Sequence, residues 1–205
     1  MSILAKNEIL KAIKSGRVTI DPFDEASVGP ASVDFHLGNT FRVFRRITQT
    51  FDVGETVDFN EITQIIEVTK AISLLPGESI HGITVESLKL PSNLCGWIQG
   101  KSSLARLGLL VHITANFIHP GMKGKQVLEM TNAGPITLNI KVGIPICQII
   151  FEETKGQATY TGRFAKQETP WLKHWFIFFN LTPLPKPILF PDVFSFIVKE
   201  QYEQR

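Results

Sequence analysis

One acidic side chain stands in surroundings that favour proton-transfer chemistry. Glu129 lies between Leu128 and Met130 in an apolar run of the sequence. Buried carboxylates are rare unless they are paired or hydrogen-bonded, because taking the charge out of water costs several kcal/mol. Two interpretations stay open. Strand alternation would place Glu129 in solvent together with Val127, whereas a pocket would hold its carboxylate and tune its pKa for moving protons.

A basic, hydroxyl-rich turn precedes Glu129 in the chain. It contains Lys101, Ser102, Ser103 and Arg106. An ammonium group and hydroxyls suit phosphate oxygens, because they donate hydrogen bonds without needing a planar fork. Together with Glu129, this turn predicts a metal-free carboxylate site with a cationic, hydroxyl-lined wall.

Several familiar sites are absent from the sequence. There is no GxxxxGK[ST] phosphate loop, no GxGxxG fingerprint and no CxxC pair of a zinc deaminase. His119, beside a Pro-Gly turn, is a candidate ligand contact, whereas His112 in an apolar run is interpreted as a core histidine. Cys95 and Cys147 also lie in apolar runs and are predicted to be buried free thiols.

Length and composition favour one globular domain with a tail. The chain has 205 residues and a formal net charge of +2. That charge is too small to attract nucleic acid by bulk electrostatics. We expect neither a signal peptide nor a membrane span, and hence a soluble, cytoplasmic protein.

The elements that must position these residues are mostly short strands. Ser2 is a candidate N-cap for an amphipathic helix over residues 1–14. Alternating runs at 32–37 and 40–44 flank Gly38 and Asn39, which predicts a β-hairpin. About ten such strands, each bounded by turn residues, indicate an all-β sandwich or barrel such as a jelly roll.

Beyond residue 151 the sequence changes character. Residues 152–167 are polar, and we weigh a mobile segment that closes over a ligand against a surface loop. Residues 171–198 are rich in aromatic residues and prolines, which forbid a continuous helix. We expect this part to pack on the domain or on a neighbouring subunit.

Residues 29–44, with the runs GKSSLARLGL and HPGMKGKQVLE, closely resemble dCTP deaminases of the dUTPase-like superfamily. The resemblance covers residues 1–168 and leaves 169–205 as an atypical tail. It implies a mainly β, distorted jelly-roll or barrel fold with a short N-terminal helix. It also implies a homotrimer with active sites at subunit interfaces, binding neither nucleic acid nor membrane.

The implied activity is hydrolysis of a C–N bond in a cyclic amidine. dCTP would become dUTP and ammonia, supplying dUMP and dTTP synthesis. The family does this without zinc, and Mg²⁺ accompanies the triphosphate. Whether dTTP inhibits this chain stays open.

The resemblance also assigns roles to individual residues. Glu129 matches the general acid/base, Ser102 and the Ala115 carbonyl match groups that hold the attacking water, and Arg106 matches the arginine that offsets developing charge. Gln148 matches a phosphate contact, and Tyr160, Arg163 and Gln167 resemble residues that close over the triphosphate. The implied substrate-binding set is Lys101, Ser102, Ser103, Leu104, Ala105, Arg106, His119, Val127, Leu128, Glu129, Gln148, Tyr160, Arg163 and Gln167.

Three positions depart from the family pattern. Lys101 stands where an arginine is common, His119 replaces an aspartate that contacts the sugar, and Met122 replaces an aromatic residue. Two alternatives therefore stay open: a bifunctional dCTP deaminase/dUTP diphosphatase, and a non-catalytic nucleotide-binding trimer. The joint presence of Ser102, Arg106 and Glu129 argues against the non-catalytic alternative.

Overall fold

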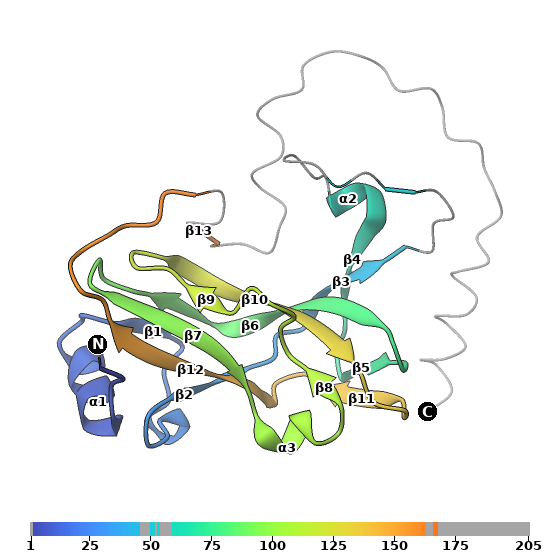
Figure 1. Ribbon diagram of the computed structural model, residues 1–205. Helices are drawn as coiled ribbons and strands as arrows, with labels where there is room; N and C mark the ends of the chain where they lie inside the picture. Colours follow the sequence, from blue (N-terminus) through green and yellow to red (C-terminus); the bar gives the residue numbers. More distant parts are fainter. Residues whose placement is uncertain (1, 46–49, 52, 54–58, 163–165, 168–205) are drawn as a thin grey trace, which may run out of the picture. The chain divides into compact units, whose positions relative to one another are not determined.

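The computed structural model describes residues 2–45, 50–51, 53, 59–162 and 166–167. These residues form a mainly β structure with a few short helices (Figure 1). The helices are α1 (Lys6–Lys14), η1 (Glu25–Ser27), α2 (Phe59–Ile62) and α3 (Ser102–Ala105). The strands are β1 (Thr19–Asp21), β2 (Val33–His36), β3 (Thr40–Phe44), β4 (Thr63–Glu67), β5 (Ala71–Leu74), β6 (Ser79–Lys89), β7 (Leu94–Gly100), β8 (Leu109–Leu110), β9 (Phe117–Ile118), β10 (Lys123–Asn132), β11 (Leu138–Lys141), β12 (Pro145–Glu153) and β13 (Lys166–Gln167).

Two larger sheets and one small one organise these strands. The first has the order β13-β10-β6-β3-β4, with β1 also pairing β6 and β8 also pairing β10. The second has the order β2-β12-β7-β9, and β11 pairs with β5. Among the described strands, β13 pairs with β10 in parallel and the other pairs are antiparallel. The described sheets do not close into a barrel, and the arrangement is jelly-roll-like, as the sequence predicts.

The core is built from alternate residues of both larger sheets. Leu88 and Leu128 of the first sheet and Phe35 and Phe151 of the second are fully buried in one apolar cluster. Because side chains alternate along a strand, their neighbours point to the other face. The polar side chains that could form a site therefore lie on the outer faces of the sheets and at the strand ends.

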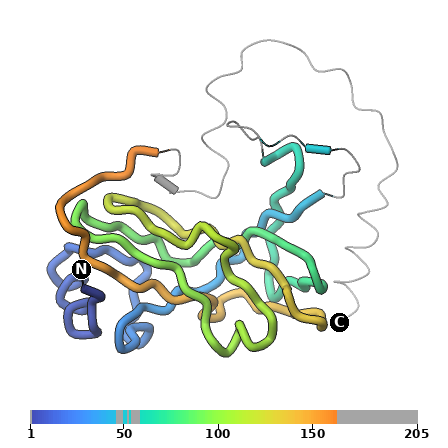
Figure 2. The backbone as a smooth tube through the Cα atoms, viewed as in Figure 1, coloured from blue at the N-terminus to red at the C-terminus, as the bar shows by residue number. Residues whose placement is uncertain are grey.

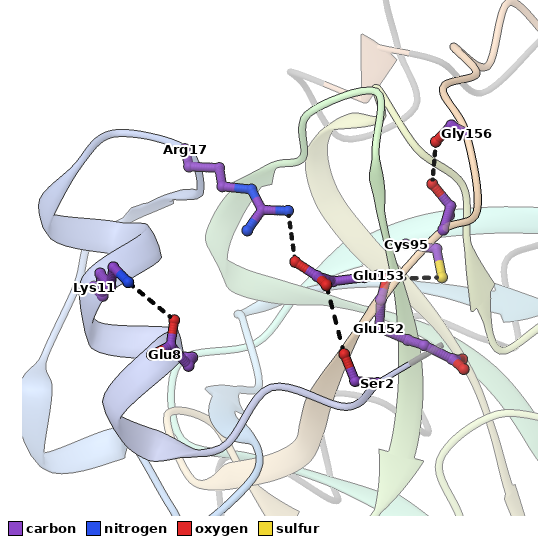
Figure 3. Close-up of polar contacts among 9 residues, drawn as sticks. Ser2, Glu8, Lys11, Arg17, Cys95, Glu152, Glu153 and Gly156 are labelled. Carbon is purple, nitrogen blue, oxygen red and sulfur yellow. Dashed lines mark hydrogen bonds and ion pairs between the residues drawn. The ribbon is translucent and has the colours of Figure 1, made fainter.

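The N-terminal helix begins later than the Ser2 cap predicts. Residues 2–4 instead lie along β12: the Leu4 N–H donates to Phe151 O at 3.0 Å, and the Glu153 N–H donates to Ser2 O at 3.1 Å. The helix starts only at Lys6, after Ala5. Figure 3 shows that Glu153 also accepts from Ser2 Oγ and from Arg17, which ties this end of the chain to the sheet.

The predicted hairpin around Gly38 is wrong, because β2 and β3 belong to different sheets. The Gly38 N–H donates to Ile83 O at 2.7 Å, and a Cβ at Gly38 would lie 2.8 Å from that oxygen. Gly38 therefore lets the chain pass closely over β6 as it crosses from one sheet to the other. The alternation predicts the strands, but the pairing partner depends on the tertiary fold.

Cys95 and Cys147 are buried free thiols, as predicted. Burial raises the pKa of both thiols, most strongly at Cys147, which disfavours a nucleophilic thiolate. Among the described helices, none is long and apolar enough to cross a membrane. The predicted tail, residues 169–205, lies outside the described residues, so its packing stays a prediction.

Candidate active site

Glu129 lies on the outer face of β10. Its neighbours Leu128 and Met130 are fully buried in the core, whereas Val127 and Glu129 point the other way and are half-buried. His81 of β6 stands directly opposite Glu129 in the strand register. Alternation thus predicts the face correctly, but this face is not open solvent at the carboxylate.

The carboxylate of Glu129 is desolvated and under-bonded. Its Oε2 is buried and has no hydrogen-bond partner among the described residues. Burial raises the pKa of Glu129, and the backbone N–H groups of Glu129 and Ile113 only partly offset that effect. A carboxyl group of this kind takes up a proton more readily than an exposed one, which suits an acid/base that works near neutral pH.

The helix α3 displays the predicted hydroxyl and guanidinium groups. It follows directly after β7, with Lys101 in extended conformation at its N-cap and Arg106 at its C-cap. Ser102, Ser103, Ala105 and Arg106 are exposed, whereas Lys101 is half-buried. Leu104 is half-buried too and packs against the core, so it anchors the turn.

These groups do not meet Glu129 within one chain. No hydrogen bond or ion pair between described residues joins Glu129 to Ser102, Ser103 or Arg106, and no charged side chain is among the causes that shift its pKa. The partners predicted from the sequence are therefore absent from the carboxylate in the single subunit.

The segment between β8 and β9 reaches Glu129 at Ile113 and contains Ala115. Residues 113–115 are exposed, and the Ile113 N–H lies near enough to lower the pKa of Glu129. Ala115 is two residues farther on, just before Asn116, whose carbonyl accepts from the Ile98 N–H at 2.8 Å. The structure thus brings the Ile113 backbone to Glu129, whereas the water-holding role of Ala115 stays a prediction.

Lys101 is already paired at the end of the second sheet. Its Nζ binds Asp34 Oδ2, and both side chains are about 30% exposed. Gln148 lies directly opposite Asp34 in the register; its Oε1 accepts from Ser32 Oγ at 2.7 Å and its Nε2 donates to Gly100 O at 3.5 Å. A phosphate that binds Lys101 must share this cation with Asp34.

His119 and Tyr160 stack on each other. Their ring centroids are 4.6 Å apart and the planes differ by 9°. Figure 2 traces the orange segment that follows β12. The Tyr160 N–H donates to Pro120 O at 2.9 Å, which ties this segment to the turn before β10. Tyr160 and His119, far apart in the sequence, therefore form one unit.

The remaining predicted contacts divide into three kinds. Leu128 is fully buried, so only its backbone could reach a ligand, and Val127 lies on the face of Glu129. Gln167 pairs with Gly124 in the parallel β13–β10 ladder, at the start of the strand that carries Glu129. Arg163 lies outside the described residues.

Sequence reasoning missed one buried carboxylate. Glu86 of β6 is 6% exposed and accepts from the His36 N–H at 2.8 Å and from His36 Nδ1 at 2.5 Å. With Asp34 and His36 it borders a cavity of about 340 Å³. Asp34 and His36 alternate with the buried Val33 and Phe35 along β2, and each side chain is 29% exposed. Strand alternation could have indicated its burial, because Glu86 lies on the same face of β6 as Thr84 and the core residue Leu88.

His81 was missed as well. It stands between Glu129 of β10 and Arg42 of β3 in one row across three strands. Burial, and secondarily Arg42, lower the pKa of His81 and so favour its neutral form. A neutral imidazole beside Glu129 leaves the carboxylate without the stabilisation that a cation would give.

Comparison with known proteins agrees with this architecture. A model of the dCTP deaminase-like family matches residues 3–154. A dCTP deaminase of Marinomonas sp. is 40% identical over 76% of this chain and 85% of its own length. A protein named "dCTP deaminase, dUMP-forming" from Parafrankia sp. is 36% identical over 82% of this chain and 88% of its own.

A solved structure supports the fold. The 2'-deoxycytidine 5'-triphosphate deaminase from Agrobacterium tumefaciens superposes with a TM-score of 0.59 at 23% identity. The match covers 74% of this chain but spans only about half (48%) of that protein. With a family model that matches most of the chain and relatives well above 30% identity, this chain belongs to the dCTP deaminase-like family.

Proposed function

We propose that the protein hydrolyses dCTP to dUTP and ammonia, with Glu129 as the general acid/base. The observation that carries the proposal is the buried, under-bonded carboxylate of Glu129 on a face that other groups must complete. The substrate is inferred from the names of the relatives, and the proton-transfer role is inferred from the raised pKa of Glu129.

The proton path needs one residue. The Glu129 carboxylate takes a proton from water as the oxygen attacks C4 of cytosine, and gives it to N3. It then takes the second proton of that oxygen and gives it to the leaving amine, while C4 becomes a carbonyl. Because burial raises the pKa of Glu129, the group both accepts and returns protons without a large energetic mismatch.

Ser102, the Ala115 carbonyl and Arg106 act around this path. The serine hydroxyl and the carbonyl orient the water. The guanidinium offsets the negative charge that develops on the atoms bonded to C4 during the attack. Their exposure in the single chain leaves them available to a ligand or to a neighbouring copy.

The triphosphate is proposed to bind at the end of the second sheet. Lys101, Ser103 and Gln148 offer one cation and two hydrogen-bonding groups there, and dCTP arrives as its Mg²⁺ complex. The Lys101–Asp34 ion pair keeps the ammonium in place before binding. Tyr160 and Gln167, whose backbones lie beside the turn before β10 and the start of β10, are proposed to cover the substrate.

We further propose a homotrimer in which neighbouring copies complete the site. Glu129 lacks its polar partners within one chain. The neighbouring segment 107–113, which contains β8 and pairs with β10, exposes Leu107 (51%), Leu110 (47%) and Ile113 (56%). Exposed apolar side chains next to an incomplete polar site are typical of an interface between copies. Such an interface would bring α3 of one copy to Glu129 of another.

One assay tests the activity and its product. The protein is incubated with dCTP and Mg²⁺, and nucleotides, pyrophosphate and ammonia are resolved over time. We expect ammonia and dUTP in equal amounts. The second candidate, a bifunctional enzyme, is favoured by the relatives whose names say dUMP-forming, and would give dUMP and pyrophosphate instead. Tight dCTP binding without turnover would reject both enzymes in favour of a nucleotide-binding trimer.

A further inference from the structure

Four rings form a continuous row at the β9 edge of the second sheet. Trp97 of β7 meets Phe117 of β9 edge-on at 4.9 Å, and Phe117 meets His119 edge-on at 4.8 Å. His119 then stacks on Tyr160 at 4.6 Å. Trp97 is itself fixed, because its Nε1 donates to Glu152 Oε2 at 2.9 Å. The row thus connects a sheet residue to a loop residue through His119.

Tyr160 belongs to a segment that lies across two turns. We call residues 154–162 the strap. The Thr154 N–H donates to Asn93 O at 3.2 Å, the Ala158 N–H to Ser92 O at 2.8 Å, and the Tyr160 N–H to Pro120 O at 2.9 Å. The rest of the strap is mostly exposed. Few buried contacts hold it, so a single ring stack is a large part of its attachment.

The turn beneath the strap is shaped to receive it. Gly121 has φ +76°, and a Cβ there would lie 2.7 Å from Thr159 Cγ2. Only a residue without a side chain allows this approach. The strap and the turn at Pro120 and Gly121 are therefore fitted to each other, with the His119 ring at one end of the contact.

We propose that His119 is a positioning residue, whose ring holds Tyr160 and the strap against this turn before the nucleotide binds. A carboxylate at this position could contact a sugar hydroxyl but could not stack. In this chain one face of the imidazole is covered by Tyr160 and its edge by Phe117. The ring therefore contributes to nucleotide affinity by ordering Tyr160 in advance, which lowers the entropic cost of binding.

Hydrogen exchange without nucleotide tests the docking itself. In His119→Ala the Ala158 and Tyr160 amides should exchange about three- to tenfold faster, the range expected for loss of one aromatic pair. His119→Phe keeps a ring and should keep the protection. Equal protection in wild type and His119→Ala, or equal loss in both variants, would overturn the proposal.

A pair of glycine variants independently tests the contact between the strap and the turn at Gly121. Gly121→Ala should displace the strap and speed exchange of the same two amides. Gly77→Ala is the matched control, because Gly77 has φ +78° but nothing within 4 Å of its Cβ position. Faster strap exchange in the control, or unchanged exchange in Gly121→Ala, would show that the strap does not depend on this contact.

The effect on the reaction rests on the proposed function and is measured as KM against kcat for dCTP. His119→Ala and His119→Asp should both raise KM about three- to tenfold with kcat within about twofold, and His119→Phe should restore KM. A lower KM in His119→Asp would mean that a carboxylate contact, and not stacking, serves this position, and would overturn the proposal. If the wild type does not deaminate dCTP, the proposed function fails, and the exchange experiments alone decide the role of His119.

Discussion

Two carboxylates on paired strands have opposite surroundings. Glu86 of β6 has both oxygens occupied, one by the His36 N–H and one by His36 Nδ1. Glu129 of β10 has a buried Oε2 without a partner among the described residues, and burial raises its pKa. Both strands belong to the same sheet and pair directly with each other.

The difference is the one expected between a structural carboxylate and a reactive one. A buried carboxylate with a fixed donor on each oxygen has its charge compensated within the fold and is costly to deprive of those donors. A buried carboxylate that lacks donors destabilises the subunit unless a ligand, a water or another copy supplies them. This comparison is consistent with a structural role for Glu86 and with the proposed acid/base role of Glu129.

Replacing Glu129 gives the largest expected effect. Glu129→Gln removes proton transfer but keeps size and polarity, so kcat for ammonia release should fall by about 10³-fold or more. Affinity for dCTP, measured by calorimetry, should stay within a few-fold of wild type. Glu67→Gln, at an exposed strand position on β4, is the control and should leave the rate unchanged. Near-normal turnover in Glu129→Gln would remove this residue from the mechanism.

Replacing Glu86 should affect stability instead. Glu86→Leu leaves the His36 N–H and ring without their acceptor, at a cost of about 2–4 kcal/mol in the free energy of unfolding. For a domain of this size the Tm should fall by about 5–15 °C in thermal unfolding. At a temperature where the variant is folded, kcat should remain near wild type. A loss of kcat without a loss of Tm would reverse the assignment of the two carboxylates.

The pH dependence of stability provides a smaller test. Because burial raises the pKa of Glu129, the folded state binds a proton more readily than the unfolded chain between the ordinary carboxyl pKa and the raised one. The free energy of unfolding contributed by this group therefore falls as pH rises through that window. The Tm of Glu129→Gln minus that of wild type should grow across the same window, by a few degrees. A difference that stays constant with pH would mean that Glu129 is not desolvated in the assembled protein.

Removing transition metals is expected to leave the deamination rate unchanged, which is the smallest of these effects. Within the described residues no group of three or more His, Cys, Asp and Glu side chains could hold a metal ion. If Glu129 is the acid/base and needs no zinc-bound water, a chelator that strips transition metals should leave the deamination rate unchanged when Mg²⁺ is kept in excess. Loss of activity that zinc restores would contradict a carboxylate-only mechanism.

Much of the fold was predictable because it depends on local patterns. Alternation predicted the β-rich architecture, and the odd placement of Glu129 between two apolar residues singled it out. Ser2 and Gly38 misled the prediction for the same reason. Each has a plausible local role as cap or turn, yet Ser2 pairs with β12 and Gly38 passes over β6. Contacts between distant segments overrode the local preference in both cases.

The sequence by itself determined the inventory of this protein: which acid, hydroxyls and cations are available, and on which strands and turns they lie. Only the tertiary structure decided which of them meet. It joined His36 to Glu86 and His119 to Tyr160, and it left Glu129 without the serine and arginine expected beside it. The physical reason is that side-chain alternation depends on a strand's own residues, whereas pairing, burial and the resulting pKa depend on segments that are distant in the chain.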